Sequence, residues 1–333
     1  MVEEGKVAII GCGKQAVKHI GGLRSDPRPP AIVVHDSVPE RMAALARHAA
    51  VETAASLEAV LDDPGVTAVV VATPTPSHSP IIRAALAAGK HVFCEKPLCE
   101  TREQALALRA AAAAAGRVLQ VGYVYREVPA FQALRRALTA PEPPLGEPVA
   151  ALLRIGGRGA HAVWKHRRAS GGGAINEMLV HMLDLAQWLF GRLSAVRWHE
   201  VLRLRPTRRI DGQEVAVDAE DFVLLSATSA RGGHVVLQAD LLTPAFRQYV
   251  EVQGSNGSFM GSIQPELPCA FDLLAAAGGL PAGRTVVHNQ GGDLFDTQMR
   301  TFLAHVRAGA AAGYADADDA LHLLEVLESR PCR

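Results

Sequence analysis

A glycine-rich turn near the start of this 333-residue chain constrains its fold more than any other feature. The turn follows an apolar run at 7–10, precedes a helical pattern at 14–23, and consists of Gly11, Cys12, Gly13, Lys14, Gln15 and Ala16. It fits G-x-G-x-x-G/A, in which small residues permit a tight turn and a close approach of backbone amides to a pyrophosphate. Free N–H groups at the helix start favour an anion there. The turn therefore predicts a dinucleotide-binding domain.

The first third of the chain continues this alternation of strand and helix. Short β-branched and apolar runs alternate with helical stretches. The expected strands are 32–35, 66–72, 91–94 and 118–122, and the expected helices are 39–48, 79–88 and 101–115. Continuous apolar strands separated by helices indicate a parallel sheet with both faces covered. We expect a Rossmann dinucleotide-binding domain over 1–124.

The chain after residue 124 has a different pattern. A proline-rich break at 141–148 precedes longer strands, and the segments 230–233 and 254–257 are typical of hairpin turns. The expected strands are 149–155, 196–204, 221–229, 233–241, 248–253 and 258–263, and the expected helices are 128–138, 174–190, 294–306 and 318–327. Strands joined by hairpins form antiparallel sheets. We expect an α+β domain over 125–333 with a predominantly antiparallel open sheet, whose last helix can pack back on the first domain.

Charge and cysteine content exclude several classes of protein. The 34 basic side chains balance 34 acidic ones, so we expect neither a nucleic-acid partner nor an anionic membrane surface. The acidic start is unlike a signal peptide, and no apolar run reaches the roughly 18 residues of a membrane span. The cysteines are Cys12, Cys94, Cys99, Cys269 and Cys332. They are scattered without a C-x-x-C spacing, so we expect reduced thiols in a cytoplasmic protein and no metal site.

An acidic residue follows the second expected strand. Asp36 lies about 20 residues after the glycine-rich turn, where the dinucleotide fingerprint expects an acid that accepts hydrogen bonds from ribose hydroxyls. A carboxylate there repels a 2′-phosphate, which favours NAD over NADP. Ser37 and Arg41 lie near enough to weaken the discrimination, so NADP stays open. The alternative is that Asp36 only caps the helix that begins near Pro39.

Three further stretches carry a family resemblance. Two follow strands of the first domain, namely A-T-P-T-P-S-H at 72–78 and E-K-P-L at 95–98. The third, in the second domain, is G-G-G-A-I-N-E-M-L-V-H-M-L-D at 171–184. In order and spacing they resemble the glucose-fructose oxidoreductase/inositol dehydrogenase/rhizopine-catabolism family over essentially the whole chain. The segment V-G-Y-V-Y-R at 121–126 looks like that family's start of the interdomain segment.

The resemblance implies roles at the strand ends. Lys96 would be the catalytic lysine that reaches the reacting hydroxyl and the nicotinamide, and the bond before Pro97 would be cis. Alternatively, Lys96 is an ordinary surface lysine at a sheet edge. The other strand-end residues expected at the cofactor are Thr73, Pro74, His78 and Glu95, and His78 would line the nicotinamide ribose.

The helical stretch after the three glycines supplies the second set of candidates. Glu177, His181 and Asp184 fall at i, i+4 and i+7, so they share one helix face. A neutral imidazole can take or give a proton near neutral pH, and Glu177 could position a hydroxyl. His181 could instead be a hydrogen-bonded core histidine, and Asp184 is better explained as structural. The family more commonly has Asp at the place of Glu177 and Gly at that of Leu179, so the pocket would differ from that of an inositol dehydrogenase.

Other polar residues are candidates for substrate binding. Gln120 and Tyr123 follow the last strand of the first domain and should face the cleft, and Arg126 and Trp164 could also contribute. The basic residues around Trp164 are Arg154, Arg158, Lys165, Arg167 and Arg168. They either clamp a phosphate or carboxylate of the substrate or belong to a solvated loop. Arg205, Arg208 and Arg209, beside Asp211, are typical of a surface turn.

Together these features predict an NAD(H)-dependent oxidoreductase. It would move a hydride between the nicotinamide and a secondary carbinol carbon of a sugar or cyclitol in the interdomain cleft, with Lys96 and His181 as candidates for the proton exchange. Three alternatives stay open: a ketosugar reductase, possibly acting on a nucleotide-linked sugar; a non-catalytic dinucleotide-binding regulator; and a glycosidase-like enzyme that recycles bound NAD. Since an exposed sheet face needs a cover, the resemblance also implies a homodimer or homotetramer.

Overall fold

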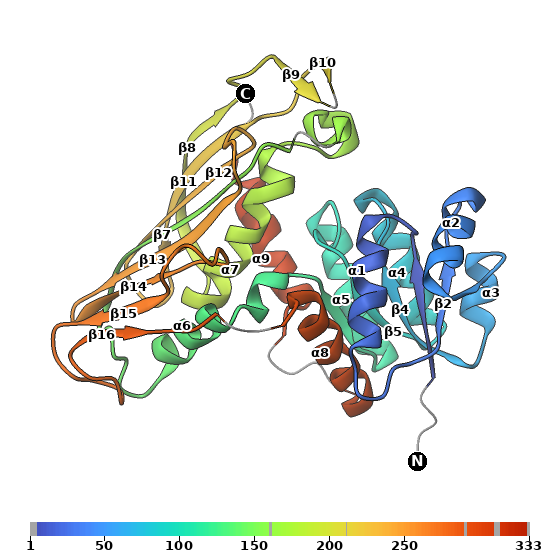
Figure 1. Cartoon of the computed structure of the whole chain (residues 1–333), viewed down its shortest axis with the longest axis horizontal. Coiled ribbons are helices and arrows are strands. Elements are labelled where there is room, and N and C mark those ends of the chain that lie inside the picture. The colour runs from blue at the N-terminus through green and yellow to red at the C-terminus, as the bar shows by residue number, and fades with distance from the viewer. Residues whose placement is uncertain (1–4, 160–161, 211, 290–291, 310–313, 332–333) are drawn as a thin grey trace. The chain divides into compact units, whose positions relative to one another are not determined.

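The computed structural model describes residues 5–159, 162–210, 212–289, 292–309 and 314–331. They form two compact units (Figure 1). Unit 1 combines Met1–Val124 with Gly292–Leu324, and unit 2 combines Tyr125–Gly291 with Glu325–Arg333. The expected boundary after residue 124 agrees with this division, but most of the C-terminal segment belongs to unit 1.

Unit 1 is a parallel six-stranded sheet in the order β3-β2-β1-β4-β5-β6. Its strands are β1 (Lys6–Ile10), β2 (Ile32–His35), β3 (Glu52–Thr53), β4 (Val66–Val71), β5 (His91–Cys94) and β6 (Leu119–Val121). Its helices are α1 (Lys14–Arg24), α2 (Pro39–Ala49), α3 (Leu57–Asp62), α4 (His78–Ala87), α5 (Arg102–Ala115) and α8 (Leu294–Ala308), and α9 (Ala317–Glu328) begins in this unit. The strand order reverses between β1 and β4, where dinucleotides bind in sheets of this kind.

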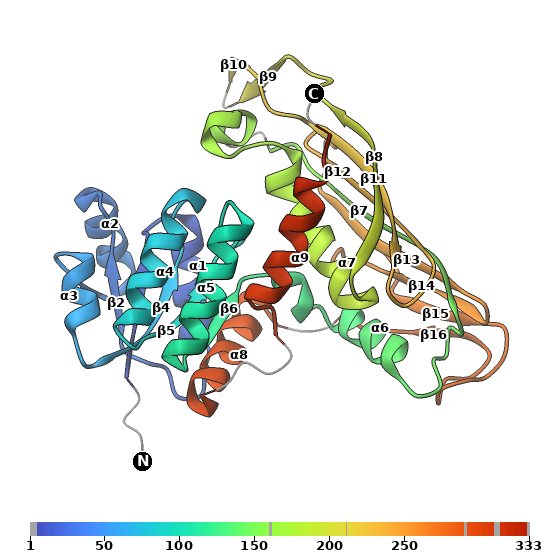
Figure 2. The same ribbon diagram turned by 180° about the vertical axis from the view of Figure 1, so that it is seen from behind.

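Both faces of this sheet are covered, and its central strands are mostly apolar. β1, β4 and β5 are almost entirely buried. Helix α8 packs on α1, and α4 packs on α5; Figure 1 shows α1 in front of the sheet and Figure 2 shows α4 and α5 in front of it. Met299 and Phe302 of α8 are fully buried in the same core as Val7 and Ile9 of β1. The returning C-terminal segment thus completes the core of unit 1.

Unit 2 is an eight-stranded sheet in the order β16-β15-β14-β13-β7-β12-β11-β8. All neighbours are antiparallel except β7 and β12, which are parallel. The strands are β7 (Pro148–Gly156), β8 (Leu193–Leu202), β11 (Phe222–Ser229), β12 (His234–Asp240), β13 (Arg247–Gly254), β14 (Gly257–Gly261), β15 (Ala270–Leu273) and β16 (Gly283–Val286). A separate hairpin pairs β9 (Thr207–Ile210) with β10 (Gln213–Ala216). The expected mainly antiparallel sheet and both expected hairpin turns are confirmed.

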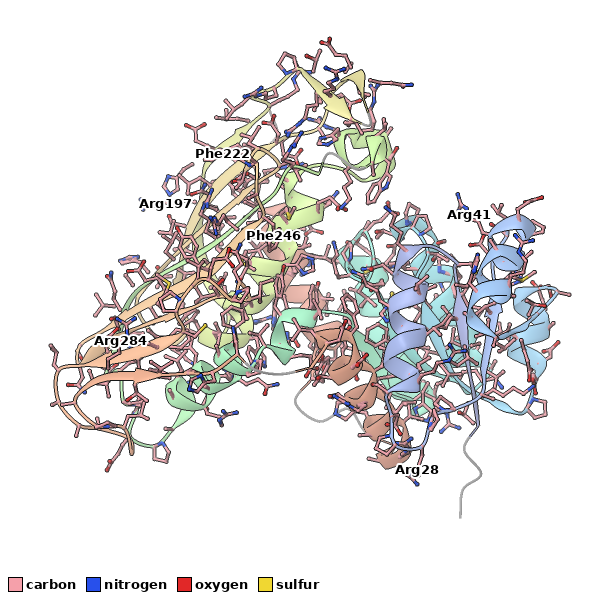
Figure 3. All side chains as sticks on the ribbon, viewed as in Figure 1. Arg28, Arg41, Arg197, Phe222, Phe246 and Arg284 are labelled. Carbon is pink, nitrogen blue, oxygen red and sulfur yellow. The ribbon has the colours of Figure 1, made fainter. Side chains whose placement is uncertain are left out.

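Helices cover one face of this sheet. They are α6 (Pro129–Thr139), a π-helical turn Ile175–Leu179, and α7 (Val180–Phe190), which contact β7, β12 and β14. Burial alternates along β11, so Val223 and Leu225 face the helices while Phe222 and Leu224 lie on the opposite, partly exposed face. The register aligns Arg197 of β8 with Ser226, on the same side as Phe222. Figure 3 shows Arg197 and Phe222 on this part of the sheet.

Candidate active site

The carboxyl ends of the unit 1 strands bring the predicted cofactor residues to one edge of the sheet. Gly11 has φ +97°, and a Cβ there would lie 2.7 Å from the carbonyl oxygen of Ala72. At Gly13 a Cβ would meet nothing within 4 Å, so this position is open. Helix α1 has neither a side-chain cap nor an acidic residue in its first turn. The turn therefore offers unsatisfied backbone donors at a helix start, which suits a pyrophosphate.

Asp36 connects this turn to the end of β2. Its Oδ2 accepts a hydrogen bond from the Cys12 amide at 2.7 Å, and its Oδ1 accepts one from the Val38 amide at 2.8 Å. Val38 is the N-cap residue of α2 and no side-chain hydrogen bond caps the helix, so the alternative that Asp36 only caps α2 is wrong. Burial and the charge of Asp36 raise the pKa of the Cys12 thiol to about 11. Ser37 and Arg41 are exposed beside it, as Figure 3 shows for Arg41.

His78 joins the segments that follow β4 and β5. The ring is buried, and its Nε2 lies 2.8 Å from the Thr73 carbonyl oxygen while its Nδ1 lies 2.9 Å from that of Pro97. The Ser77 hydroxyl donates to Thr73 Oγ1 at 2.7 Å. His78 therefore organises the two loops, and its expected contact with a nicotinamide ribose stays a prediction. Pro74 lies in the same loop, just before a 3₁₀ turn at Thr75–Ser77.

Lys96 is the second residue after the end of β5, at this edge of the sheet. It is partly exposed, and the Lys96–Pro97 peptide bond is cis, as expected. Glu95 beside it is buried, with Oε1 2.9 Å from His19 Nε2 and Oε2 accepting the Lys96 amide hydrogen at 3.2 Å. Burial alone would raise the pKa of Glu95, but the hydrogen bond and charge of His19 and the charge of Lys96 outweigh it and lower that pKa. A carboxylate therefore supports the backbone of Lys96.

Two residues expected to face a substrate are buried within unit 1. Gln120 has no exposed surface, and its Oε1 lies 2.9 Å from Nδ1 of His305 in α8. Burial lowers the pKa of His305. Tyr123 is 1% exposed. The apolar run at 118–122 indicated the end of a strand, but nothing in the sequence showed that α8 packs against Gln120. The contacts of Gln120 and Tyr123 with a substrate stay predictions.

Arg126 and Asp184 form a buried ion pair within unit 2. Arg126 Nε donates to Asp184 Oδ2 at 3.0 Å, and Nη2 donates to Oδ1 at 2.5 Å. Both side chains are less than 5% exposed. The guanidinium of Arg126 is thus held bidentately by a carboxylate, and its expected contact with a substrate stays a prediction. The same pair gives Asp184 a structural partner.

The segment with Glu177 and His181 is not one uniform α-helix. Ile175–Leu179 is a π-helical turn, and α7 begins only at Val180. The expected single helix over 174–190 is therefore corrected to a π turn followed by α7, and the shared face of Glu177 and His181 stays a prediction. Single π turns often occur at functional sites.

Glu220 fixes the start of this π turn, and the sequence gave no sign of it. Its backbone oxygen accepts from the Ala174 amide at 2.9 Å, and its Oε1 accepts from the Ile175 amide at 3.2 Å. Gly173 has φ +113°, and a Cβ there would overlap with the Glu220 carboxylate. Glycine is thus required where Glu220 approaches the helix start.

Glu177 and His181 each have a neighbour in unit 2. Glu177 Oε2 lies 2.6 Å from Lys165 Nζ, and both side chains are less than 20% exposed. The Lys165 ammonium lies 5.5 Å from the ring centre of Trp164, which is 47% exposed. The ring centres of His181 and Tyr125 are 5.0 Å apart. These residues combine a cation, an anion, an imidazole and an aromatic surface, which suits polyhydroxylated ligands.

The basic residues around Trp164 differ in their exposure and in whether a carboxylate lies beside them. Arg154 Nη2 lies 3.3 Å from Asp240 Oδ2, and Lys165 is paired with Glu177, so these two cations are balanced by carboxylates. Arg158 and Arg168 are exposed and Arg167 is partly exposed. Arg208 donates to the Arg158 carbonyl oxygen at 3.2 Å, whereas Arg205 and Arg209 are exposed and Asp211 lies outside the described residues. A phosphate or carboxylate clamp stays a prediction.

Some expectations concern other kinds of site. Cys12, Cys94, Cys99 and Cys269 are free thiols, and Cys332 lies outside the described residues. Within the described ranges, no three histidine, cysteine or acidic side chains cluster in a way that could hold a metal ion. The part of the chain that the structure describes also contains no helix long and apolar enough to cross a membrane.

Comparisons with known proteins agree with this architecture. A family model described as "Oxidoreductase family, NAD-binding Rossmann fold" matches residues 5–123, and "GFO/IDH/MocA C-terminal domain" matches 131–260. An inositol 2-dehydrogenase of Acidothermus cellulolyticus is 31% identical over 268 residues, which cover 78% of this chain and 74% of the relative. A scyllo-inositol 2-dehydrogenase (NAD(+)) of Bacillus subtilis is 27% identical, covering 97% and 92%. The solved structure "Levoglucosan dehydrogenase, complex with NADH and L-sorbose" has a similar fold, with TM-score 0.85, 22% identity and coverage of 97% and 96%.

Proposed function

The chain belongs to the GFO/IDH/MocA family of NAD-binding oxidoreductases, and we propose that it moves a hydride between nicotinamide and a secondary carbinol carbon of a sugar or cyclitol. The observation that carries the proposal is the strand-end edge of unit 1, where the glycine-rich turn and Lys96 lie on one sheet edge. Relatives named inositol 2-dehydrogenase support the substrate class.

The residues of unit 1 fit a dinucleotide. Gly11 lets the turn pass close to the Ala72 carbonyl, where a Cβ would overlap, and Gly13 is open. The uncapped start of α1 offers its amides to a pyrophosphate. Asp36 would accept from the adenosine ribose while it holds the Cys12 amide. The expected contacts of Lys14, Gln15 and Ala16 follow from their place in the first turn of α1. When bound, the nicotinamide accepts or donates the hydride, and the protein residues have to handle the proton.

Lys96 and His181 are the proposed proton carriers. Oxidation of a hydroxyl needs a base, either Lys96 Nζ or a ring nitrogen of His181, and reduction needs the matching acid. The Glu95 carboxylate accepts a hydrogen bond from the backbone amide of Lys96, and this bond fixes the backbone from which the Lys96 side chain extends. Glu177, held by Lys165, would accept a hydrogen bond from a second hydroxyl and orient the ring. Trp164 would cover an apolar face of that ring.

The test is absorbance at 340 nm with NAD and then NADP against inositols, free sugars and sugar acids. We expect NADH formation with a polyol, and higher kcat/KM with NAD because of Asp36. NADPH consumption with ketosugars alone would favour a biosynthetic reductase. NAD binding by calorimetry without any turnover would favour a regulator. Cofactor that survives purification with no net NADH would favour the glycosidase-like cycle.

We also propose that a second copy of this chain covers the outer face of the eight-stranded sheet. Phe222 and Leu224 of β11 and Val236 of β12 lie partly exposed on the same face of the sheet. A homodimer or homotetramer would bury these apolar side chains. Light scattering should give the mass of two or four chains, and Leu224→Glu should lower it. A single-chain mass for the native protein at micromolar concentration would contradict this. The four free thiols fit a reducing cytoplasm.

A further inference from the structure

A buried histidine of α1 contacts the carboxylate beside Lys96. His19 has no exposed surface, and its Nε2 lies 2.9 Å from Glu95 Oε1. The ring packs edge-on against Phe93, with centres 5.2 Å apart, and against Phe295, with centres 5.9 Å apart. Its other nitrogen, Nδ1, has no hydrogen-bond partner among the residues that the structure describes. An apolar side chain could fill this space between two phenylalanines, so the contact with Glu95 is the reason for a polar residue here.

Glu95 uses its two oxygens on two different segments. Oε1 meets His19 of α1, and Oε2 accepts the Lys96 amide hydrogen at 3.2 Å. The lowered pKa of Glu95 means that a carboxylate bridges them. His19 Nε2 must then carry the hydrogen that it donates to this carboxylate. The helix that begins at the glycine-rich turn is thereby joined, through one carboxylate, to the backbone of the proposed proton carrier.

We propose that His19 is a positioning residue that holds Glu95, and through it Lys96, in the geometry needed for proton exchange. The proposal rests on the proposed function, since it assigns Lys96 to the reaction. Without the imidazole N–H, a buried carboxylate loses its charge-assisted donor. It then turns away or takes up water, and the Lys96 backbone loses a fixed acceptor. A small displacement of a group that exchanges a proton is sufficient to reduce turnover strongly.

Two variants separate this role from simple packing. His19→Leu keeps an apolar filling between Phe93 and Phe295 but removes the donor, whereas His19→Gln keeps an amide N–H near the place of Nε2. We expect His19→Leu to lower kcat about 10- to 100-fold with the NADH dissociation constant changed less than about threefold, and His19→Gln to recover most of the loss. The matched control is His91→Leu, which removes another buried histidine of unit 1, at the opposite end of β5. It should leave kcat near the native value.

A second readout does not depend on the substrate. Competitive acetylation followed by mass spectrometry gives the reactivity of Lys96, with Lys6 of β1 as internal reference. We expect the relative rate at Lys96 to change in His19→Leu and to return in His19→Gln. If the native protein oxidises no polyol, the proposed function fails, yet this comparison still tests the positioning of Lys96.

Defined results would overturn the proposal. Unchanged kcat and unchanged Lys96 reactivity in folded His19→Leu would do so, and so would a folded His19→Gln as impaired as His19→Leu. If His19→Leu does not fold, His19→Asn takes its place, because its shorter amide does not reach the position of Nε2. Equal rates for the Asn and Gln variants would then refute the role.

Discussion

Replacing Gly173 by alanine should damage unit 2 at the start of the helix that presents Glu177 and His181. The positive φ of +113° disfavours any residue with a Cβ, at about 1–3 kcal/mol. The Cβ would also overlap with the Glu220 carboxylate, which has to move and give up its hydrogen bond to the Ile175 amide. A lost bond to a charged group costs about 1.5–3 kcal/mol. We therefore expect a loss of about 2.5–6 kcal/mol.

Gly171→Ala is the matched control for this change. Gly171 also has a positive φ, +74°, but a Cβ there would meet nothing within 4 Å. Its replacement should cost only the left-handed strain, about 1–2 kcal/mol. All three tryptophans, Trp164, Trp188 and Trp198, lie in unit 2, so urea unfolding followed by tryptophan fluorescence reports on this unit. If Gly173→Ala unfolds at the same urea concentration as Gly171→Ala, the assignment of Glu220 is wrong.

Three further outcomes are expected. Lys96→Ala should abolish NADH formation while calorimetry still detects cofactor binding, and equal loss of both would make Lys96 structural. The folded-state pKa of Glu95 is lowered, so its contribution to stability is present above its ordinary pKa and is lost as the pH falls through the folded-state value. The free energy of unfolding below about pH 4.5 should therefore depend less on pH in Glu95→Gln than in the native protein. An identical pH dependence in the two proteins would show that the Glu95 carboxylate does not contribute to it. Asp36→Ser should shift the NAD to NADP ratio of kcat/KM toward NADP by about tenfold or more, and an unchanged ratio would show that Asp36 only supports the turn.

The strands of unit 1 could be predicted almost residue by residue, and the reason is physical. A strand buried on both faces must be apolar throughout, so β1 and β4 are distinct in the sequence. β3 has only two residues, both exposed, and no pattern indicates it. The same logic found the strand-end residues, because glycine, acid and lysine at strand ends of one parallel sheet share an edge.

The parts of the candidate site that sequence did not predict depend on contacts between distant residues. The π turn contains one residue more than a turn of an α-helix, and the spacing of apolar residues in the sequence does not reveal this extra residue. Glu220 acts on Gly173 and Ile175, over 40 residues before it, and Arg126 meets Asp184 58 residues later. No spacing rule relates such pairs. His19 lies within the expected helix at 14–23, and only the fold brings Glu95 to it.

The return of the C-terminal segment to unit 1 bears on how the chain is made. Met299 and Phe302 of α8 are fully buried in the core of the first sheet, beside residues synthesised almost 300 positions earlier. During translation the parallel sheet of unit 1 therefore keeps an uncovered flank until α8 has left the ribosome. A shortened gene that ends before α8 would yield an aggregation-prone product. Recombination at a single crossover within 125–291 could not exchange unit 1 between relatives, because the segments that form its core are encoded on both sides of that stretch.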